Sequence, residues 1–184
     1  REDGYFPEAF VNLLAFLGWN PGDDREMFTM DELIKAFSLD RIVKSGARFN
    51  PEKARWYNKE YLRLKSDEEL AELFVPILEE HGMRIVESAD SAKAAGAETN
   101  ELGADPASHI FTMDYVRDVI SFTKERATFV KDFWTIASYL FIAPEDFEKY
   151  GVKAGAAVEP QNNGPRRQAD PRAKVFDDAA TAPF

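Results

Sequence analysis

Helix-start signals recur along the first 70 residues of this 184-residue chain, and they constrain its fold more than any other feature. Thr29 and Glu32 have the spacing of a capping box, in which two side chains satisfy unpaired amides at the start of a helix. Ser66 and Glu69 repeat that spacing. The pair Asn50-Pro51 is a further start, because a proline there lacks only an N–H that the first turn leaves unpaired. These signals predict a chain that is mainly α-helical.

Apolar residues follow these starts at intervals of three and four, which is the period of an amphipathic helix. For a helix that starts at Pro7 and is capped by Gly18, the predicted apolar stripe consists of Phe6, Phe10, Leu13, Leu14 and Leu17. For the helix that starts at Thr29, the predicted buried face consists of Met30, Leu33, Ile34 and Phe37. The third helix, from Pro51 to about Leu64, carries Trp56, Tyr57, Tyr61 and Leu62.

The second half of the chain has less regular patterns. A helix is predicted after Ser66, with a kink or break at Pro76, because an internal proline removes a backbone hydrogen bond. Residues 87–108 are rich in small and acidic residues and are predicted to be weakly helical or loop. One long helix is expected over 112–140, followed by a helical turn over 145–150. No segment alternates clearly enough to predict a sheet, so the expected fold is mainly α and multihelical.

Composition excludes several classes of site. The chain has no cysteine, which excludes disulfides, cysteine-bound zinc and thiol catalysis. Its two histidines, His81 and His109, do not have a metal-ligand spacing, and no phosphate-binding or catalytic motif is present. No apolar run reaches the roughly 18 residues that cross a bilayer, and the N-terminus is not a signal peptide. A soluble, cytoplasmic chain is therefore expected, with no metal site and no membrane partner.

Charge is distributed unevenly along the chain, whose net charge is −10. Residues 1–34 carry a net −6, residues 35–65 a net +6, and residues 66–105 a net −9. The overall charge argues against indiscriminate nucleic-acid binding. A local basic patch still attracts phosphate, because salt screens charges that are more than about 8–10 Å away. The basic segment is therefore the strongest functional signal.

Three cations of the basic segment, Arg55, Lys59 and Arg63, are four residues apart and share one face of the predicted helix. A row of cations beside aromatic residues is typical of a helix that grips an RNA backbone. The same pattern is typical of a solvated helix face, and the charge pattern alone favours that alternative.

A second, weaker cluster of cations falls on the predicted long helix. It consists of Arg117, Lys124, Arg126 and Lys131. Because acidic residues alternate with these cations, ion pairs within the helix are the favoured interpretation.

Several segments have residue types, order and spacing that occur together in a known family. They are GYFPEAFVNLLAFLGW at 4–19, EMFT at 26–29, FSLDRI at 37–42, KSGARFNPEK at 44–53 and RWYNKEYL at 55–62. These segments resemble the stretch that follows the signature lysine loop of bacterial glutamate–tRNA ligases. Further on, KERATF at 124–129 and the pair Phe133-Trp134 resemble a late helix of the same family's anticodon-binding region. The resemblance covers roughly residues 1–150, in the C-terminal part of such an enzyme.

The resemblance implies a stem-contact region at 1–62, then a helical anticodon-binding region at 63–150. Residues 151–184, rich in Ala, Pro and Gly, are expected to form a flexible tail. The catalytic half, a Rossmann-type fold that binds ATP, glutamate and the tRNA acceptor end, is expected to be absent. No catalysis and no cofactor are therefore expected for this chain alone, although the complete enzyme would use ATP and Mg²⁺. Its partners would be tRNA and the catalytic half, and the chain would be a monomer.

The resemblance and the two cation clusters together suggest which residues contact tRNA. These residues are Lys44, Arg48, Lys53, Arg55, Lys59, Arg63, Arg117, Lys124 and Arg126. No catalytic or metal-binding residue is predicted. A different class of function stays open: a helical module that binds a protein partner through its aromatic-rich surface and does not bind RNA. A third possibility is a chain that binds RNA only weakly without its catalytic half.

Overall fold

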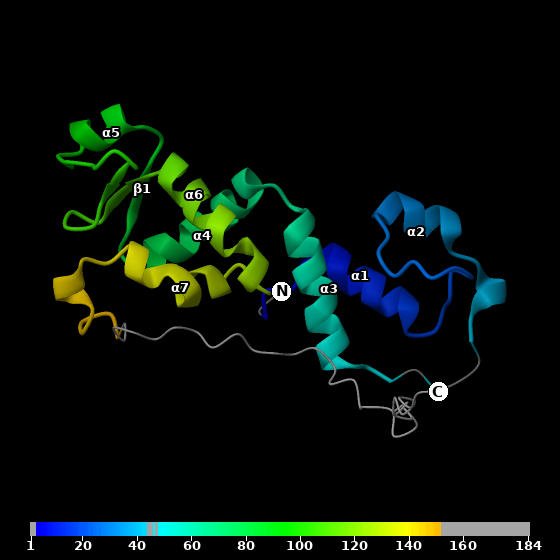
Figure 1. The fold of residues 1–184 in the computed structure, drawn as a ribbon. Coiled ribbons are helices and arrows are strands. Elements are labelled where there is room, and N and C mark those ends of the chain that lie inside the picture. Colours follow the sequence, from blue (N-terminus) through cyan, green and yellow to red (C-terminus); the bar gives the residue numbers. More distant parts are fainter. Residues whose placement is uncertain (1–2, 44–45, 47, 152–184) are drawn as a thin grey trace, which may run out of the picture.

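The computed structural model describes residues 3–43, 46 and 48–151, and within them it is mainly helical with one small sheet (Figure 1). The α-helices are α1 (Pro7–Phe16), α2 (Met30–Ala36), α3 (Pro51–Leu64), α4 (Asp67–Glu80), α5 (Ala89–Ala94), α6 (Met113–Thr123) and α7 (Asp132–Ala137). The 3₁₀ turns are η1 (Leu39–Arg41), η2 (Lys124–Arg126), η3 (Ser138–Leu140) and η4 (Pro144–Asp146). The strands are β1 (Arg84–Val86), β2 (Ala104–Asp105) and β3 (Ile110–Thr112). In Figure 1, α2 lies at one end of the molecule, α5 and β1 lie at the other, and α1 and α3 lie between them.

Both predicted capping boxes are confirmed. The Thr29 side chain accepts from the amide of Glu32, whose carboxylate accepts from the Thr29 amide at 2.8 Å. Ser66 and Glu69 make the same exchange at 3.2 and 3.0 Å. Asn50 caps α3 through its side-chain oxygen. Local sequence therefore determines where these helices begin. The predicted helical turn at 145–150 is present in part as η4, whereas the predicted tail lies outside the described residues beyond Gly151.

A buried asparagine ties α1 to its neighbours. The Asn12 side-chain oxygen accepts from the Phe28 amide at 2.9 Å and from the Tyr61 hydroxyl at 2.9 Å. Its side-chain amide donates to the Glu26 carbonyl at 2.8 Å. Because every polar atom of this buried side chain has a partner, it costs little to bury and fixes α1 against α3.

Aromatic residues of the second half lie in the main core, which residues of α1 and α3 share. Phe74 of α4, Phe133 of α7 and Phe141 are all fully buried. The Phe74 ring centroid lies 5.6 Å from that of Phe133 and 6.0 Å from that of Phe141, in the edge-on arrangement that aromatic pairs prefer. In the part of the chain that the structure describes, no helix is both long and apolar enough to cross a membrane.

The predicted stripe of α1 is wrong in part. Phe6 and Leu13 are buried, but Phe10 and Leu14 are 37% and 49% exposed. The reason is that α1 packs against α3 with the side that also carries the buried Asn12, so one edge of the stripe points away from the core.

The predicted buried face of α2 is largely wrong. Only Leu33 is buried, in a small cluster with Trp19 and Phe28. The other apolar residues assigned to that face are exposed, namely Met30, Ile34 and Phe37. Within the described residues, α2 has too small a neighbouring core to cover the whole face.

The predicted left-handed cap at Gly18 and the predicted break at Pro76 are both absent. Gly18 does not adopt a positive φ, because the Trp19 amide continues the helical pattern by donating to the Ala15 carbonyl at 3.1 Å. Pro76 does not break α4. Both Pro76 and Glu72, whose carbonyl would have bonded to residue 76, are exposed, so water can satisfy that carbonyl.

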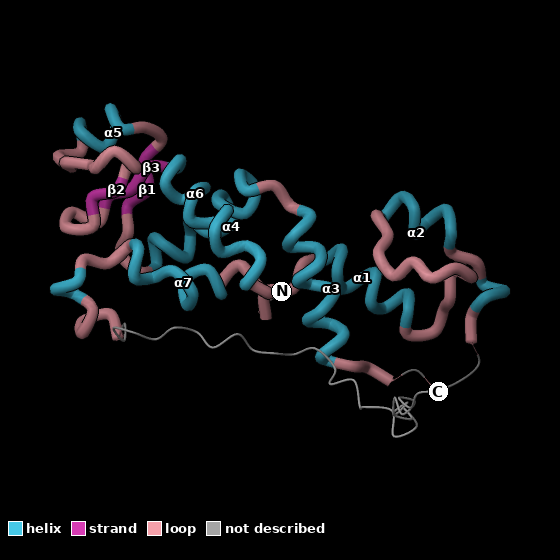
Figure 2. The backbone as a smooth tube through the Cα atoms, viewed as in Figure 1, coloured by secondary structure: helices cyan, strands magenta, loops and turns pink. Residues whose placement is uncertain are grey.

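The absence of a sheet was predicted, and this is wrong: a three-stranded sheet has the order β1-β3-β2 (Figure 2). β1 is parallel to β3, and β2 is antiparallel to it. The strands have only two or three residues, and β3 is buried at every position, so there is no alternation of polar and apolar residues to detect. The segment 87–108, predicted to be weakly helical or loop, contains the short α5 and β2.

The single long helix predicted over 112–140 is wrong, because α6 and α7 are separate helices. The Asp132 carboxylate accepts from the amides of Thr128 and Phe129, each at 2.9 Å, and this closes a turn before α7. The Asn58 side chain on α3 donates to the Thr128 carbonyl at 2.6 Å. A side chain 70 residues away thus satisfies a carbonyl that the helix would otherwise have used.

Candidate nucleic-acid interface

α3 presents the predicted cations on one continuous helix. Its buried side carries Tyr57 and Leu62, whereas Arg55 is exposed and Lys59 is partly exposed. Neither cation forms an ion pair with a carboxylate among the described residues. Two such cations, one helical turn apart, can donate to neighbouring phosphate oxygens.

The ring of Phe129 brings the two cation clusters together. The Arg55 guanidinium lies 5.8 Å from its centroid, and the Lys131 ammonium lies 5.3 Å from it. Phe129 itself is 7% exposed and packs edge-on against Tyr5, with centroids 4.9 Å apart. Lys131, which the sequence pattern assigned to pairing within a helix, has no ion pair in the described residues. Sequence reasoning missed this site because its two cations are 76 positions apart.

Arg63 completes the predicted row, but two carboxylates occupy its guanidinium. It lies 3.2 Å from Glu60 and also pairs with Glu125 of η2. The hydrogen bond to Glu125 raises the pKa of Arg63. The pair links α3 to η2, and it leaves Arg63 less free to contact a phosphate than Arg55.

The remaining predicted cations of the basic segment lie in the first turn of α3 or before it. Lys53 pairs with Glu26 at 2.8 Å, and its ammonium lies 5.7 Å from the centroid of the Tyr57 ring. Arg48 is exposed in the segment that leads into α3. Lys44 lies outside the described residues.

The predicted cations of the second half lie in an acidic setting, except for Arg126, which is exposed at the end of η2. Arg117 pairs with Asp114 and lies 3.7 Å from Glu68. Lys124 pairs with Asp67 at 2.9 Å. Because these cations already have carboxylate partners, they are poorer phosphate ligands than Arg55 or Lys59.

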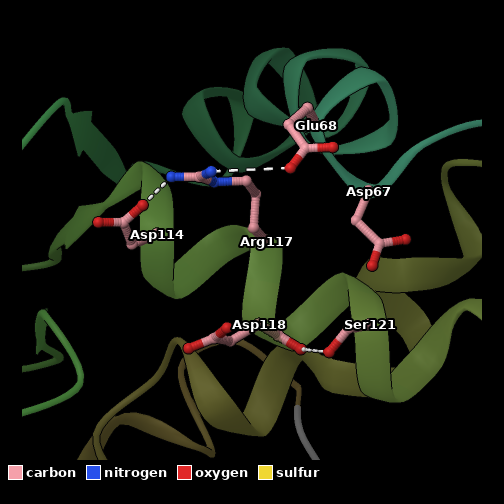
Figure 3. A pocket seen from close by; sticks show the side chains of 6 residues that line it. All are labelled: Asp67, Glu68, Asp114, Arg117, Asp118 and Ser121. Carbon is pink, nitrogen blue, oxygen red and sulfur yellow. Dashed lines mark hydrogen bonds and ion pairs between the residues drawn. The ribbon is translucent and has the colours of Figure 1, made fainter.

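Arg117 also lines a shallow cavity of about 300 Å³ between α4 and α6 (Figure 3). Its lining residues are Asp67, Glu68, Asp114, Arg117, Asp118 and Ser121. Four carboxylates outnumber one guanidinium, so the hollow repels a phosphate backbone. Among the described residues, no group of three or more acidic or histidine side chains has a geometry that could hold a metal ion.

Part of the chain matches a protein-family model. Residues 1–56 match the family described as tRNA synthetases class I (E and Q), catalytic domain. The resemblance placed the same residues in a stem-contact region outside the catalytic half. The match relates them instead to a catalytic-domain family, and the stem-contact role stays a prediction.

Curated relatives match a longer part of the chain. A glutamate–tRNA ligase from Bacteroides fragilis is 42% identical over 153 residues, which are 83% of this chain and 25% of the relative. A glutamate–tRNA ligase from Parabacteroides distasonis is 43% identical over 149 residues, which are 81% of this chain and 24% of the relative. The chain thus spans about a quarter of the length of the curated relatives it matches.

A solved structure shows the same similarity in three dimensions. The glutamate tRNA ligase from Elizabethkingia meningosepticum, determined in complex with its amino acid, has 38% identity and a TM-score of 0.59. The match covers 81% of this chain and 26% of that chain. Over about four fifths of its length, this chain is therefore similar to one quarter of a glutamate–tRNA ligase.

Proposed function

We propose that this chain is the tRNA-contacting part of a glutamate–tRNA ligase, an enzyme that attaches glutamate to its tRNA using ATP. The proposal is supported by relatives of that name that are 40% and 42% identical over 83% of the chain. Formation of the aminoacyl-adenylate, with ATP and Mg²⁺, belongs to the rest of the enzyme. The contribution of this chain is positional, and it performs no catalysis alone.

The observation that carries the tRNA contact is the set of cations around α3. Arg55, Lys59 and Lys131 have no carboxylate partner among the described residues, whereas Lys53 has one and Arg63 has two. Cations without partners lose less when they bind phosphate, because no ion pair has to be broken. Contacts to phosphates orient a nucleic acid without reading its sequence, which fits a positional role.

The acidic hollow between α4 and α6 limits where the tRNA lies. A polyanion is repelled from the carboxylates around Arg117 and attracted to the side of α3 that carries Arg55. Within this proposal, residues 1–62 contact the stem and residues 63–150 face the anticodon arm. The remaining partner is the catalytic half of the same enzyme, in the cytoplasm, and the chain is a monomer.

Replacing both Arg55 and Lys59 with Ala is expected to weaken binding to glutamate tRNA. The logarithm of the binding constant falls linearly with the logarithm of salt concentration, and each lost phosphate contact flattens the slope by about 0.7–0.9. The double variant is therefore expected to flatten it by roughly 1.4–1.8. Fluorescence anisotropy with labelled glutamate tRNA, across a salt series, measures this slope.

The matched control replaces Lys35 of α2 and Lys93 of α5 with Ala. Both are exposed, and the change in net charge is the same. This control is expected to keep the slope of the unmodified chain. If the α3 variant and the control have equal slopes, the assignment of phosphate contacts to α3 is wrong.

The alternative function, a helical protein-interaction module without RNA binding, is favoured by one observation. Ile34 and Leu39 are 68% and 75% exposed and belong to a group of exposed apolar side chains, and such a group is typical of a protein-contact surface. The same titration separates the two functions. Absence of tRNA binding even at low salt would favour the interaction module, or a chain that binds only when joined to its catalytic half.

A further inference from the structure

Exposed apolar side chains are concentrated in one part of the molecule. Of the sixteen large apolar side chains that are exposed among the described residues, eleven lie within residues 10–56 and five lie beyond them. The most exposed of the eleven are Leu39 at 75%, Ile34 at 68% and Val43 at 52%. Scattered apolar residues are normal on a surface, but a group of them marks a contact.

α2 exposes apolar residues with a helical period. Met30, Ile34 and Phe37 are separated by four and three positions, so they stand on one side of the helix. Leu33, beside this stripe, is the one residue of α2 that is buried. The pattern is that of a helix with a buried face, and yet the described residues leave Met30, Ile34 and Phe37 between 43% and 68% exposed.

The segment after α2 is held next to the stripe. The Phe37 ring centroid lies 5.5 Å from that of Trp19, which is 3% exposed. Trp19 and Ile42 form an isolated β-bridge, and the Val43 amide donates to the Gly18 carbonyl at 2.8 Å. We use the term apolar patch for the exposed residues of this segment: Met30, Ile34, Phe37, Leu39, Ile42 and Val43. These contacts hold Phe37, Ile42 and Val43 beside Trp19 and Gly18.

We infer that the apolar patch docks against the rest of a glutamate–tRNA ligase catalytic domain, an inference that rests on the proposed function. The whole patch lies within residues 1–56, the part that matches the catalytic-domain family. The chain spans a quarter of the relatives' length, so most of such an enzyme lies outside the match. An interface between parts of one domain is apolar, like a core cut in half, and this is the character of the patch.

Cysteine labelling tests the docking, because the chain has no cysteine of its own. Ile34→Cys places a thiol in the patch, and Phe122→Cys places one on α6, at a side chain that is 81% exposed and outside the patch. Each variant is labelled with N-ethylmaleimide as the chain alone and within a chimeric ligase. In the chimera, this chain replaces the matching segment of the Bacteroides fragilis enzyme. Mass spectrometry of the peptide that contains the new cysteine gives its labelling rate.

Docking predicts that the cysteine at position 34 reacts at least roughly tenfold more slowly in the chimera than in the chain alone, since labelling then requires the contact to open. The cysteine at position 122 is expected to react at similar rates in both. If an active chimera leaves position 34 as reactive as in the chain alone, the docking is overturned and the proposed function stands.

The remaining outcomes separate the docking from the proposed function. Protection of position 34 in a chimera that does not attach glutamate to tRNA supports the docking and counts against the proposed function. A chimera that is inactive and leaves position 34 reactive counts against both. Light scattering of the chain alone tests whether a second copy of the chain binds the apolar patch. A stable dimer in which the cysteine at position 34 is already protected overturns the docking in favour of this dimer.

Discussion

The two halves of the molecule, residues 3–64 and 66–151, use their apolar residues differently. In the second half, Phe74 and Phe133 are fully buried in a closed core, to which α1 and α3 of the first half also contribute. In the first half, a small cluster around Trp19 covers only one side of α2 and leaves Ile34 exposed. The second half thus buries its large aromatic residues in a closed core, whereas the first half buries α1 and α3 in that core and leaves the apolar face of α2 exposed.

Charge separates the halves in the same way. The first half carries the cations of α3, and the second half contributes the acidic hollow around Arg117. The two halves meet at Phe129, where Arg55 of the first half and Lys131 of the second half approach one ring. The contrast teaches that the candidate binding surface is built on the junction of the halves, not on either half alone.

The largest expected effect compares two phenylalanines, one in each half. Phe74→Ala empties a site in a closed core and is expected to lower the free energy of unfolding by about 3–5 kcal/mol. Phe37→Ala removes a side chain that is 43% exposed, and its expected cost is about 1 kcal/mol or less. Urea unfolding followed by circular dichroism measures both. Equal costs would break the comparison, because Phe37 would then stabilise its half as a core residue does.

An intermediate effect is expected where the halves are joined. The Asn58 side chain accepts from the Phe6 amide at 2.7 Å and donates to the Thr128 carbonyl at 2.6 Å. Asn58→Leu leaves both groups without this partner, and the expected loss is about 2–4 kcal/mol in the free energy of unfolding. The control, Asn20→Leu, changes an exposed side chain that accepts one local amide and should cost about 1 kcal/mol or less.

The junction variant also has a local signature. Hydrogen exchange should become faster at the amides of Thr128 and Phe129, because the turn before α7 loses its link to α3. If Asn58→Leu unfolds at the same urea concentration as Asn20→Leu and these amides exchange as before, the halves are not joined through this side chain.

The smallest expected effect depends on pH and lies in the second half. Both carboxylate oxygens of the buried Asp105 accept hydrogen bonds, from the amides of Glu98 at 3.0 Å and Ser108 at 3.2 Å. Burial alone raises the pKa of Asp105, but the hydrogen bonds from Ser108 and Glu98 outweigh it and leave the pKa below its usual value. A carboxylate with a lowered pKa stabilises the fold above the pKa of the unfolded chain, about 3.9, and this stabilisation is lost as the pH falls through the folded pKa.

Asp105→Asn replaces one acceptor oxygen of the carboxylate with an amide nitrogen, and it also removes the titratable group. At pH 7 the variant is expected to be less stable by about 1 kcal/mol, and the difference should narrow below about pH 4. Thermal or urea unfolding at several pH values measures the difference. If the difference in the free energy of unfolding stays constant between pH 7 and pH 3, the charge of Asp105 contributes nothing to the stability of the second half.

Much of the helical part of the fold follows from local sequence. The capping boxes at Thr29 and Ser66 and the cap at Asn50 form as predicted, because each involves groups within three residues of one another. The sheet and the break before α7 could not be predicted in this way. β3 pairs with a segment 26 positions earlier, and the turn at Thr128 depends on Asn58, so both are products of distant contacts.

The candidate site divides along the same line. The sequence alone determined that Arg55 and Lys59 share a helix face, because one helical period fixes that geometry. Only the tertiary structure decided that Lys131 approaches Arg55 across Phe129, that Arg63 and Lys124 are occupied by carboxylates, and that the apolar stripe of α2 points outward. Helical period determines which residues lie together on one element. Whether that face meets a core, a carboxylate or solvent depends on residues that are distant in the chain and brought near by packing.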